Sequence, residues 1–256
     1  MNDVVLVEVT DRVATVTINR PEARNALSTD VLRVLPAAVG ECDANDDVDV
    51  IILTGADPAF SAGIDLKELG AGRNSGMAAP PAERRGPLPP TSKPIIGAIN
   101  GVAVTGGFEL ALACDFLVAS DRARFADTHA RVGIQPGWGL TVLLAEAVGV
   151  RRAREMSATG NFIDAPTALS WGLVNHVVPH DELLPFCRRL AADIVSNDQV
   201  AVRRILATYD EGALVTAGEW WDIEGRVSRE WLQQGGGTDV EQRRRAIMAR
   251  GRTQVQ

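Results

Sequence analysis

The stretch Lys93–Ala111 reads KPIIGAINGVAVTGGFELA and runs from an apolar segment through glycines into a helix-like segment. Its first seven residues are typical of a buried strand, and a short helix is predicted over 108–113. A similar turn, FSAGIDLK at 60–67, follows another apolar strand predicted at 48–54. In α/β sheets, binding sites gather at the carboxyl ends of strands, where helix N-termini present unpaired N–H groups. Two such turns facing each other could aim two backbone donors at one oxygen, as in an oxyanion hole.

Glycines in these turns also have a simpler explanation, since they permit tight turns and close helix packing. For either turn alone that explanation is sufficient. Two such turns on successive strands favour a reactive site, particularly because Glu109 lies three residues beyond Gly106. No GxSxG, HExxH or phosphate-loop pattern competes with this interpretation. Cys114 lies in an apolar helical segment and is predicted to be a buried, inert thiol rather than a nucleophile.

Strands alternate with helices along most of the chain. The sequence predicts strands at 4–9, 13–18, 48–54, 93–99, 116–119 and 173–178. Helices are predicted at 29–39, 108–113, 140–157, 165–171 and 183–195, and over roughly 200–232. Apolar runs that alternate with helices are typical of a mainly parallel, helix-covered sheet. We therefore predict an α/β core over 1–195 and a helical C-terminal region over 196–256, with a surface loop rich in glycine and proline at 70–90.

The composition limits the classes of function. The chain has 256 residues, 46% of them hydrophobic, and a formal net charge of -7. This apolar fraction excludes a disordered chain, and the acidic balance disfavours nucleic acids and anionic membranes as partners. Three widely spaced cysteines form no metal-binding pair and suit a reducing compartment. Because the start lacks a secretory segment and no apolar run reaches about 20 residues, the sequence predicts a cytoplasmic protein without a metal site.

Several long motifs, in order, resemble those of the crotonase superfamily, the enoyl-CoA hydratase/isomerase family. The matching segments are NRPEARNAL at 19–27, the two turns at 60–67 and 93–115, VGIQPG at 132–137, and the segment 160–178. The resemblance implies a crotonase-like (ββα)n spiral core whose C-terminal helices form a homotrimer or a dimer of trimers. It also implies an acyl-CoA thioester as the partner, with coenzyme A arriving as part of the substrate and no prosthetic group.

The resemblance assigns roles to individual residues. The N–H groups of Ile64 and Gly106 would form the oxyanion hole for the thioester carbonyl. Glu109 falls where hydratases keep one of their two glutamates, which position water or move a proton. The substrate and coenzyme A would be bound along Ala23, Arg24, Ala62, Asp65, Leu66 and Lys67. An acidic chain can bind the phosphates of coenzyme A only through oriented N–H groups and local cations, such as Arg24, Lys67 or the arginine-rich tail after Asp239.

The sequence departs from the hydratase pattern at His129, which stands where the second glutamate is expected. A neutral imidazole with a near-neutral pKa could act as a base there. On a strand, Asp127 would share a face with His129, so both could reach the same cavity. Alternatively, His129 is a solvated or hydrogen-bonded residue without a catalytic role. His176 and His180 are predicted to be surface residues, and Trp220, Trp221 and Trp231 to lie in core or subunit contacts.

The resemblance implies a lyase, most concretely an enoyl-CoA hydratase that adds water to 2-enoyl-CoA thioesters through an oxyanion-stabilised enolate, as in fatty acid metabolism. The missing second glutamate leaves two alternatives open. One is an enoyl-CoA isomerase or another enolate reaction in the same fold. The other is a catalytically weak protein that binds acyl-CoA, because the two backbone donors are kept while one acid/base group is not.

Overall fold

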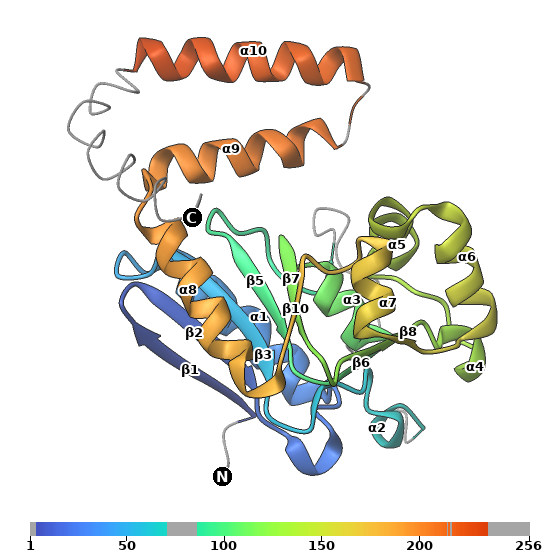
Figure 1. The fold of residues 1–256 in the computed structure, drawn as a ribbon. Helices are drawn as coiled ribbons and strands as arrows, with labels where there is room; N and C mark the ends of the chain where they lie inside the picture. Colours follow the sequence, from blue (N-terminus) through green and yellow to red (C-terminus); the bar gives the residue numbers. More distant parts are fainter. Residues whose placement is uncertain (1–3, 71–85, 214, 216, 235–256) are drawn as a thin grey trace. The chain divides into compact units, whose positions relative to one another are not determined.

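The computed structural model describes the backbone of residues 4–70, 86–213, 215 and 217–234 (Figure 1). The chain divides into two compact units, Met1–Ser196 and Asn197–Gln256. Three features named above lie outside the described residues or side chains: most of the 70–90 loop, the arginine-rich tail, and the side chains of Trp220, Trp221 and Trp231. Within the described part of the chain, no helix has the length and apolar character required to cross a membrane.

The first sheet has six strands in the order β1-β2-β3-β5-β7-β10. Their bounds are β1 Val5–Thr10, β2 Val13–Ile18, β3 Val50–Gly55, β5 Ile95–Ile99, β7 Phe116–Ser120 and β10 His176–Val178. Strands β1 and β2 form an antiparallel hairpin, and every other neighbouring pair is parallel. The hairpin closes through Asp11 and Arg12, whose positive φ angles of 50° and 65° suit the right-handed twist of the two strands.

A second sheet was not predicted from the sequence pattern. It contains β4 Ala59–Ser61, β6 Val102–Val104, β8 Arg124–Ala126 and β9 Ile163–Asp164, in the order β4-β6-β8-β9. Each of its first three strands closely follows a strand of the first sheet and precedes a helix. The resulting units are β3-β4-α2, β5-β6-α3 and β7-β8-α4. The repeated ββα core implied by the resemblance is therefore present. Strands of two or three residues are too short to leave a recognisable alternation in the sequence.

Helices of the first unit connect and cover these sheets. They are α1 Thr29–Ala44, α2 Leu66–Gly70, α3 Gly106–Leu112, α4 His129–Val132, α5 Leu140–Val148, α6 Val150–Thr159, α7 Ala165–Trp171 and α8 Leu183–Val195, with short 3-10 turns at Pro21–Ala23 and His180–Glu182. The single helix predicted over 140–157 is wrong, because Gly149 (φ 82°) separates α5 from α6. The helix predicted to end at Val39 continues to Ala44 with Pro36 inside it.

The central strands are buried on both faces, which explains their continuous apolar sequences. On one face, Val50, Ile52 and Ile96 pack in a cluster with Leu183, Cys187 and Ala191 of α8. On the other face, Ile51, Leu53, Ile95 and Ile99 join the larger cluster that includes Val31 and Leu35 of α1. Figure 1 shows α8 crossing the strands of this sheet. The alternation along each strand thus divides its side chains between two helix layers.

The second unit consists, in its described part, of α9 Gln199–Gly212 and α10 Ala217–Gln233. The side chain of Asp198 caps α9 by accepting a hydrogen bond from the Ala201 N–H at 3.0 Å. Ion pairs join the two helices, with Arg204 to Glu230 at 2.8 Å and Arg226 to Glu211 at 2.7 Å. A pocket of about 350 Å³ between them is lined by Arg204, Ile205, Tyr209 and Val227 among others.

Candidate active site

The two glycine turns meet where β4 pairs with β6. Gly63 has a φ of 81°, and a Cβ built on it would lie 2.8 Å from the Val104 carbonyl oxygen and 3.4 Å from the Gly106 nitrogen. A Cβ on Gly107 would lie 2.5 Å from the Ser61 carbonyl oxygen. Contacts this short exclude any larger side chain, so glycine is required for the two turns to approach each other. The sequence-level explanation by tight packing is therefore correct, and it also brings the predicted donors together.

Ile64 and Gly106 present backbone N–H groups beside this contact. Leu27 pairs with both neighbours of Ile64, donating to the Gly63 oxygen at 2.8 Å and accepting from the Asp65 N–H at 3.1 Å. The Ile64 N–H itself has no acceptor among the described residues. The same holds for the Gly106 N–H at the start of α3. Two adjacent free donors can stabilise negative charge on a ligand oxygen.

Thr105 sets the direction of the Gly106 N–H. Its φ of 52° and ψ of -122° are unusual for a β-branched residue. The conformation is held by the Thr105 N–H, which donates to the Ala126 oxygen at 3.2 Å, and by a hydroxyl contact of 2.5 Å with Thr128. Backbone strain of this kind persists only where surrounding contacts impose it. No pattern in the sequence indicated this role.

Glu109 lies in the first turn of α3 and is only 2% exposed. Its Oε1 accepts a hydrogen bond from the backbone N–H of Trp138 at 2.8 Å. Its Oε2 lies 3.5 Å from Nε2 of His129. The carboxylate predicted to be catalytic is therefore held by two partners that are 20 and 29 residues away, and it is on the same helix as the Gly106 donor.

His129 is the first residue of α4 and is buried, with an exposure of 5%. Its Nδ1 lies 2.7 Å from Oδ1 of Asp127, which also accepts the His129 backbone N–H at 3.1 Å. The predicted shared strand face is wrong, because β8 ends at Ala126. The two side chains meet because Asp127 accepts the backbone N–H two residues on, in an Asx turn at the start of α4.

The electrostatics of His129 differ from the expected neutral imidazole. Burial lowers the pKa of the ring, but hydrogen bonds and charge interactions with Asp127 and Glu109 outweigh it and raise the pKa to about 9. Burial likewise would raise the pKa of Asp127, yet hydrogen bonds from His129 and Ser157 lower it below its usual value. The raised pKa favours the protonated ring at neutral pH, in contrast to the near-neutral pKa expected from the sequence.

Trp138 is a site residue that the sequence reasoning missed. Besides its N–H bond to Glu109, its indole ring borders the predicted donors. A Cβ built on Gly106 would lie 3.1 Å from Cζ3 of Trp138 and 3.4 Å from Cγ1 of Ile64. The ring is 8% exposed. Nothing in the local sequence indicates this position, because the contact joins α3 to the loop between α4 and α5.

The residues predicted to bind coenzyme A lie around the loop at 19–27. The Ala62 N–H donates to the Arg24 oxygen at 2.9 Å, which joins two of them directly. Ala23 and Ala62 are half-buried, whereas Arg24, Leu66 and Lys67 are exposed. Asn25 holds the loop in place by donating from Nδ2 to the carbonyl oxygens of Ala56 and Ala59 at 2.6 Å each.

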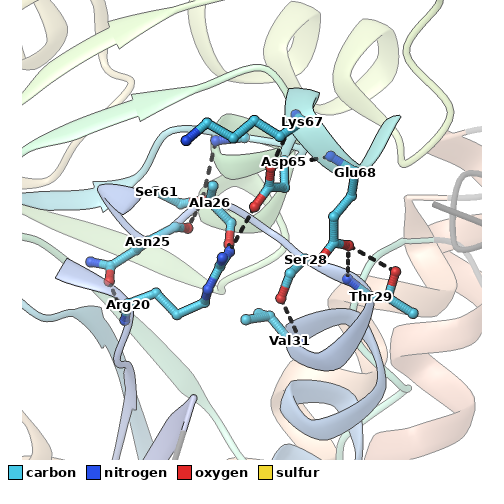
Figure 2. A network of polar contacts seen from close by, with 11 residues as sticks. Arg20, Asn25, Ala26, Ser28, Thr29, Val31, Ser61, Asp65, Lys67 and Glu68 are labelled. Atoms are coloured by element: carbon cyan, nitrogen blue, oxygen red, sulfur yellow. Dashed lines mark hydrogen bonds and ion pairs between the residues drawn. The ribbon is translucent and has the colours of Figure 1, made fainter. Parts of the chain in front are cut away.

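Asp65 differs from its neighbours because its carboxylate is used within the protein. Oδ2 pairs with Nη1 of Arg20 at 3.1 Å, and Oδ1 accepts the Lys67 N–H at 3.1 Å (Figure 2). Burial would raise the pKa of Asp65, but these partners hold it below its usual value. The side chain thus orients the start of α2 and leaves Lys67 free to extend away from it (Figure 2).

Local sequence predicted the surroundings of His176 and Cys114 correctly, but not those of His180. His176 is exposed, as predicted. The surface prediction for His180 is wrong: its side chain is 13% exposed, with Nδ1 3.0 Å from the Ser120 hydroxyl and Nε2 2.9 Å from Oδ2 of Asp57. Cys114 is buried, as predicted, and burial raises the pKa of its thiol well above the usual value.

Fold and geometry together define a class of protein, an α/β chain of repeated ββα units in which neighbouring turns present free backbone donors beside a buried acid. A sequence profile described as Enoyl-CoA hydratase/isomerase matches residues 8–235. The chain therefore belongs to the enoyl-CoA hydratase/isomerase family, as its motifs predicted.

Individual relatives cover most of the chain. A protein of Arabidopsis thaliana named probable enoyl-CoA hydratase 1, peroxisomal, is 41% identical over 212 residues, which is 83% of this chain and 80% of that protein. A short-chain-enoyl-CoA hydratase of Clostridium acetobutylicum is 41% identical over 209 residues and 79% of each chain. The crystal structure of an enoyl-CoA hydratase from Mycobacterium tuberculosis matches with a TM-score of 0.76 and 50% identity, covering 89% of this chain and 98% of that one.

Proposed function

We propose that this chain is an enoyl-CoA hydratase, a lyase that adds water across the double bond of a 2-enoyl-CoA thioester. The observation that carries the proposal is the buried carboxylate of Glu109 on the helix that begins with the Gly106 donor. The relatives named as enoyl-CoA hydratases support the same reaction. Hydration of enoyl thioesters is a step of fatty acid metabolism, which is the proposed role in lipid metabolism.

The proposed mechanism follows from the contacts of these residues. The N–H groups of Ile64 and Gly106 donate to the thioester carbonyl oxygen, whose negative charge grows as the enolate forms. Glu109 removes a proton from the water that attacks C3. The Trp138 N–H and the His129 ring, one at each carboxylate oxygen, orient the Glu109 carboxylate. Because the backbone donors are preformed, little reorganisation accompanies the charge transfer.

Coenzyme A would bind along the exposed residues Arg24, Leu66 and Lys67, next to Ala23, Ala62 and the backbone of Asp65. The net charge of -7 does not oppose this, because the phosphates need only a few nearby cations. Arg24 and Lys67 are both exposed and lie on segments joined by the Ala62 to Arg24 hydrogen bond. No prosthetic group or metal takes part in this scheme, since the substrate brings its own coenzyme A.

His129 stands where the hydratase pattern has its second glutamate. This difference favours a second candidate, an enoyl-CoA isomerase or another enolate reaction. Isomerisation needs the same carbonyl polarisation but moves a proton between two carbons, so a single carboxylate such as Glu109 can be sufficient. A third candidate is an acyl-CoA-binding protein with weak turnover. A panel of crotonyl-CoA, longer 2-enoyl esters and 3-enoyl esters separates the three. Loss of the conjugated thioester absorbance of a 2-enoyl ester reports hydration, and its appearance from a 3-enoyl ester reports isomerisation. Tight binding without turnover on every ester would favour the binding protein.

Replacement of Glu109 tests the hydratase proposal. We expect Glu109→Gln to lower kcat by about 10²- to 10⁴-fold, because the amide cannot accept the proton from water. The affinity for a CoA ester should change little, because the amide has the same shape and its oxygen still accepts the Trp138 N–H. Glu146→Gln is the matched control, since Glu146 is an exposed residue of α5. Unchanged turnover by Glu109→Gln would contradict the assigned role.

The second unit is proposed to act in assembly into a homotrimer or a dimer of trimers. Ile205 and Tyr209 of α9 are 57% and 60% exposed, and both line the pocket against α10. Large apolar side chains exposed on one helix face are typical of a surface covered by another subunit.

The proposed location is the cytoplasm, because the three cysteines are free and buried, although the relatives include peroxisomal and mitochondrial forms.

A further inference from the structure

The His129 ring lies between two carboxylates that come from different elements. Nδ1 is 2.7 Å from Oδ1 of Asp127, in the loop after β8, and Nε2 is 3.5 Å from Oε2 of Glu109 on α3. The three side chains are each buried, with exposures of 3% for both carboxylates and 6% for the ring. On the side facing α6, a hydrogen bond from Ser157 completes the surroundings of Asp127. The three side chains thus form a row, Asp127–His129–Glu109, with the imidazole ring between the two carboxylates.

The two flanking carboxylates favour a proton on both ring nitrogens. A neutral imidazole has one N–H donor and one lone pair, whereas each nitrogen here faces a carboxylate oxygen that can only accept. The doubly protonated ring can donate to Asp127 and form an ion pair with Glu109. Asp127 makes the shorter contact and also accepts the His129 backbone N–H, so it fixes the position of the ring as well as its charge. The raised pKa of His129, about 9, has the same physical cause.

We propose that Asp127 is a positioning residue that keeps His129 protonated, so that the imidazolium replaces a second carboxylate as the proton donor to the substrate. The proposal rests on the hydratase function proposed above and deepens it. It assigns opposite roles to the two groups that face the substrate. Glu109 accepts a proton from water, and His129 gives one to carbon.

The proton balance closes without any other reactant. As the water oxygen bonds to C3, Glu109 takes one water proton and the C2–C3 π electrons move toward the thioester oxygen. The resulting enolate returns its electron pair to C2, which takes the proton from Nε2 of His129. Glu109 then passes its proton to Nε2 across the 3.5 Å contact. Both groups regain their starting state, and the substrate has gained one molecule of water.

The first experiment needs no substrate and follows the three histidine rings by NMR of ¹⁵N-labelled protein during a pH titration. His129→Gln identifies the His129 signal. In the wild type this ring should stay protonated to about pH 9. In Asp127→Asn its pKa should fall by at least about one unit, because a neutral amide removes the charge interaction. A wild-type ring that titrates near 6.5, or an unchanged pKa in Asp127→Asn, would overturn the proposal whether or not the protein hydrates any ester.

The second experiment measures kcat/KM for crotonyl-CoA against pH. The wild type should lose activity above about pH 9, and Asp127→Asn should lose it at least about one unit lower, with KM unchanged. Asp121→Asn, an exposed aspartate in the turn after β7, is the matched control and should keep the wild-type profile. A merely structural role for Asp127 would lower activity at every pH without moving the alkaline limb, and that result would refute the proposal.

A second variant keeps the test decisive if Asp127→Asn fails to fold, as judged by circular dichroism. Asp127→Ser retains a side-chain oxygen that can cap the His129 N–H but carries no charge. In this variant we again expect a lower pKa of His129 and a loss of activity at lower pH on the alkaline side of the profile. If the NMR result holds while no enoyl ester is hydrated, the proposed function fails and the ionisation of His129 stands. If hydration occurs and the His129 pKa is near 6.5, only the present inference fails.

Discussion

His129 shows how much a single residue can depend on partners that are distant in sequence. Glu109 and Gly106 were predicted from one continuous motif, and the structure has them in the same helix. The partners of Glu109 could not be predicted in this way, because Trp138 and His129 reach it through the packing of α3 against later segments. Those partners raise the pKa of His129 above the near-neutral value of an unperturbed histidine.

The raised pKa of His129 makes stability depend on pH. A group whose pKa is higher in the folded state stabilises the protein fully below its unfolded pKa of about 6.5. That stabilisation is lost as pH rises through about 9, because only the folded state still binds the proton. We expect this residue to lower the free energy of unfolding by on the order of 2–3 kcal/mol over that range.

Urea unfolding at several pH values between 6.5 and 9 measures this contribution. His129→Gln is the comparison, because it removes the titrating group while keeping a side chain that can donate. The difference in unfolding free energy between the two proteins should decrease steadily with pH. A difference that stays constant across the range would show that His129 does not remain protonated in the folded protein.

Elements of the second sheet position the site although they are very short. Strand β4 places the 61–64 turn against β6, and β6 leads into α3, so the two donors follow the ends of adjacent parallel strands. The loop between α4 and α5 then brings Trp138 over Gly106 and Ile64. The fold thus assembles the site from three successive ββα units, and each contributes one side of it.

Trp138 is expected to limit the length of the acyl group, because its indole ring occupies space next to the Gly106 donor. In Trp138→Leu, a shorter side chain should admit longer chains. The ratio of kcat/KM for a ten-carbon 2-enoyl ester to that for crotonyl-CoA should rise by about tenfold or more. Such a change corresponds to the binding contacts of a few methylene groups. Trp171→Leu, a half-buried residue of α7 that stacks with Arg152, is the matched control. An unchanged ratio in Trp138→Leu would exclude a role in chain-length selection.

The whole molecule consists of two compact units, and the second is proposed to hold subunits together. A trimer of the 27.3 kDa chain has a mass of 3 × 27.3, about 82 kDa, and a dimer of trimers twice that. Light scattering of the full chain should give one of these masses. The double change Ile205→Glu and Tyr209→Glu should lower it toward one chain, because charges would be buried in the proposed contact.

Leu6→Glu provides the control for this measurement, since Leu6 is an exposed apolar residue of β1 in the first unit. It should leave the mass unchanged. A wild-type mass of about 27 kDa, or a mass that the double variant does not alter, would contradict the assignment of α9 to a subunit contact.

By itself the sequence determined the α/β class, the longer strands and helices, and the family, because each of these leaves a pattern within a few consecutive residues. It could not show the second sheet, whose strands are too short to produce a pattern, or the break at Gly149. Only the tertiary structure decided the ion pair of Asp65 with Arg20, the contact of Trp138 with Glu109, and the charge of His129. Those properties depend on burial and on the groups that folding brings within about 3 Å, and no local stretch of sequence contains them.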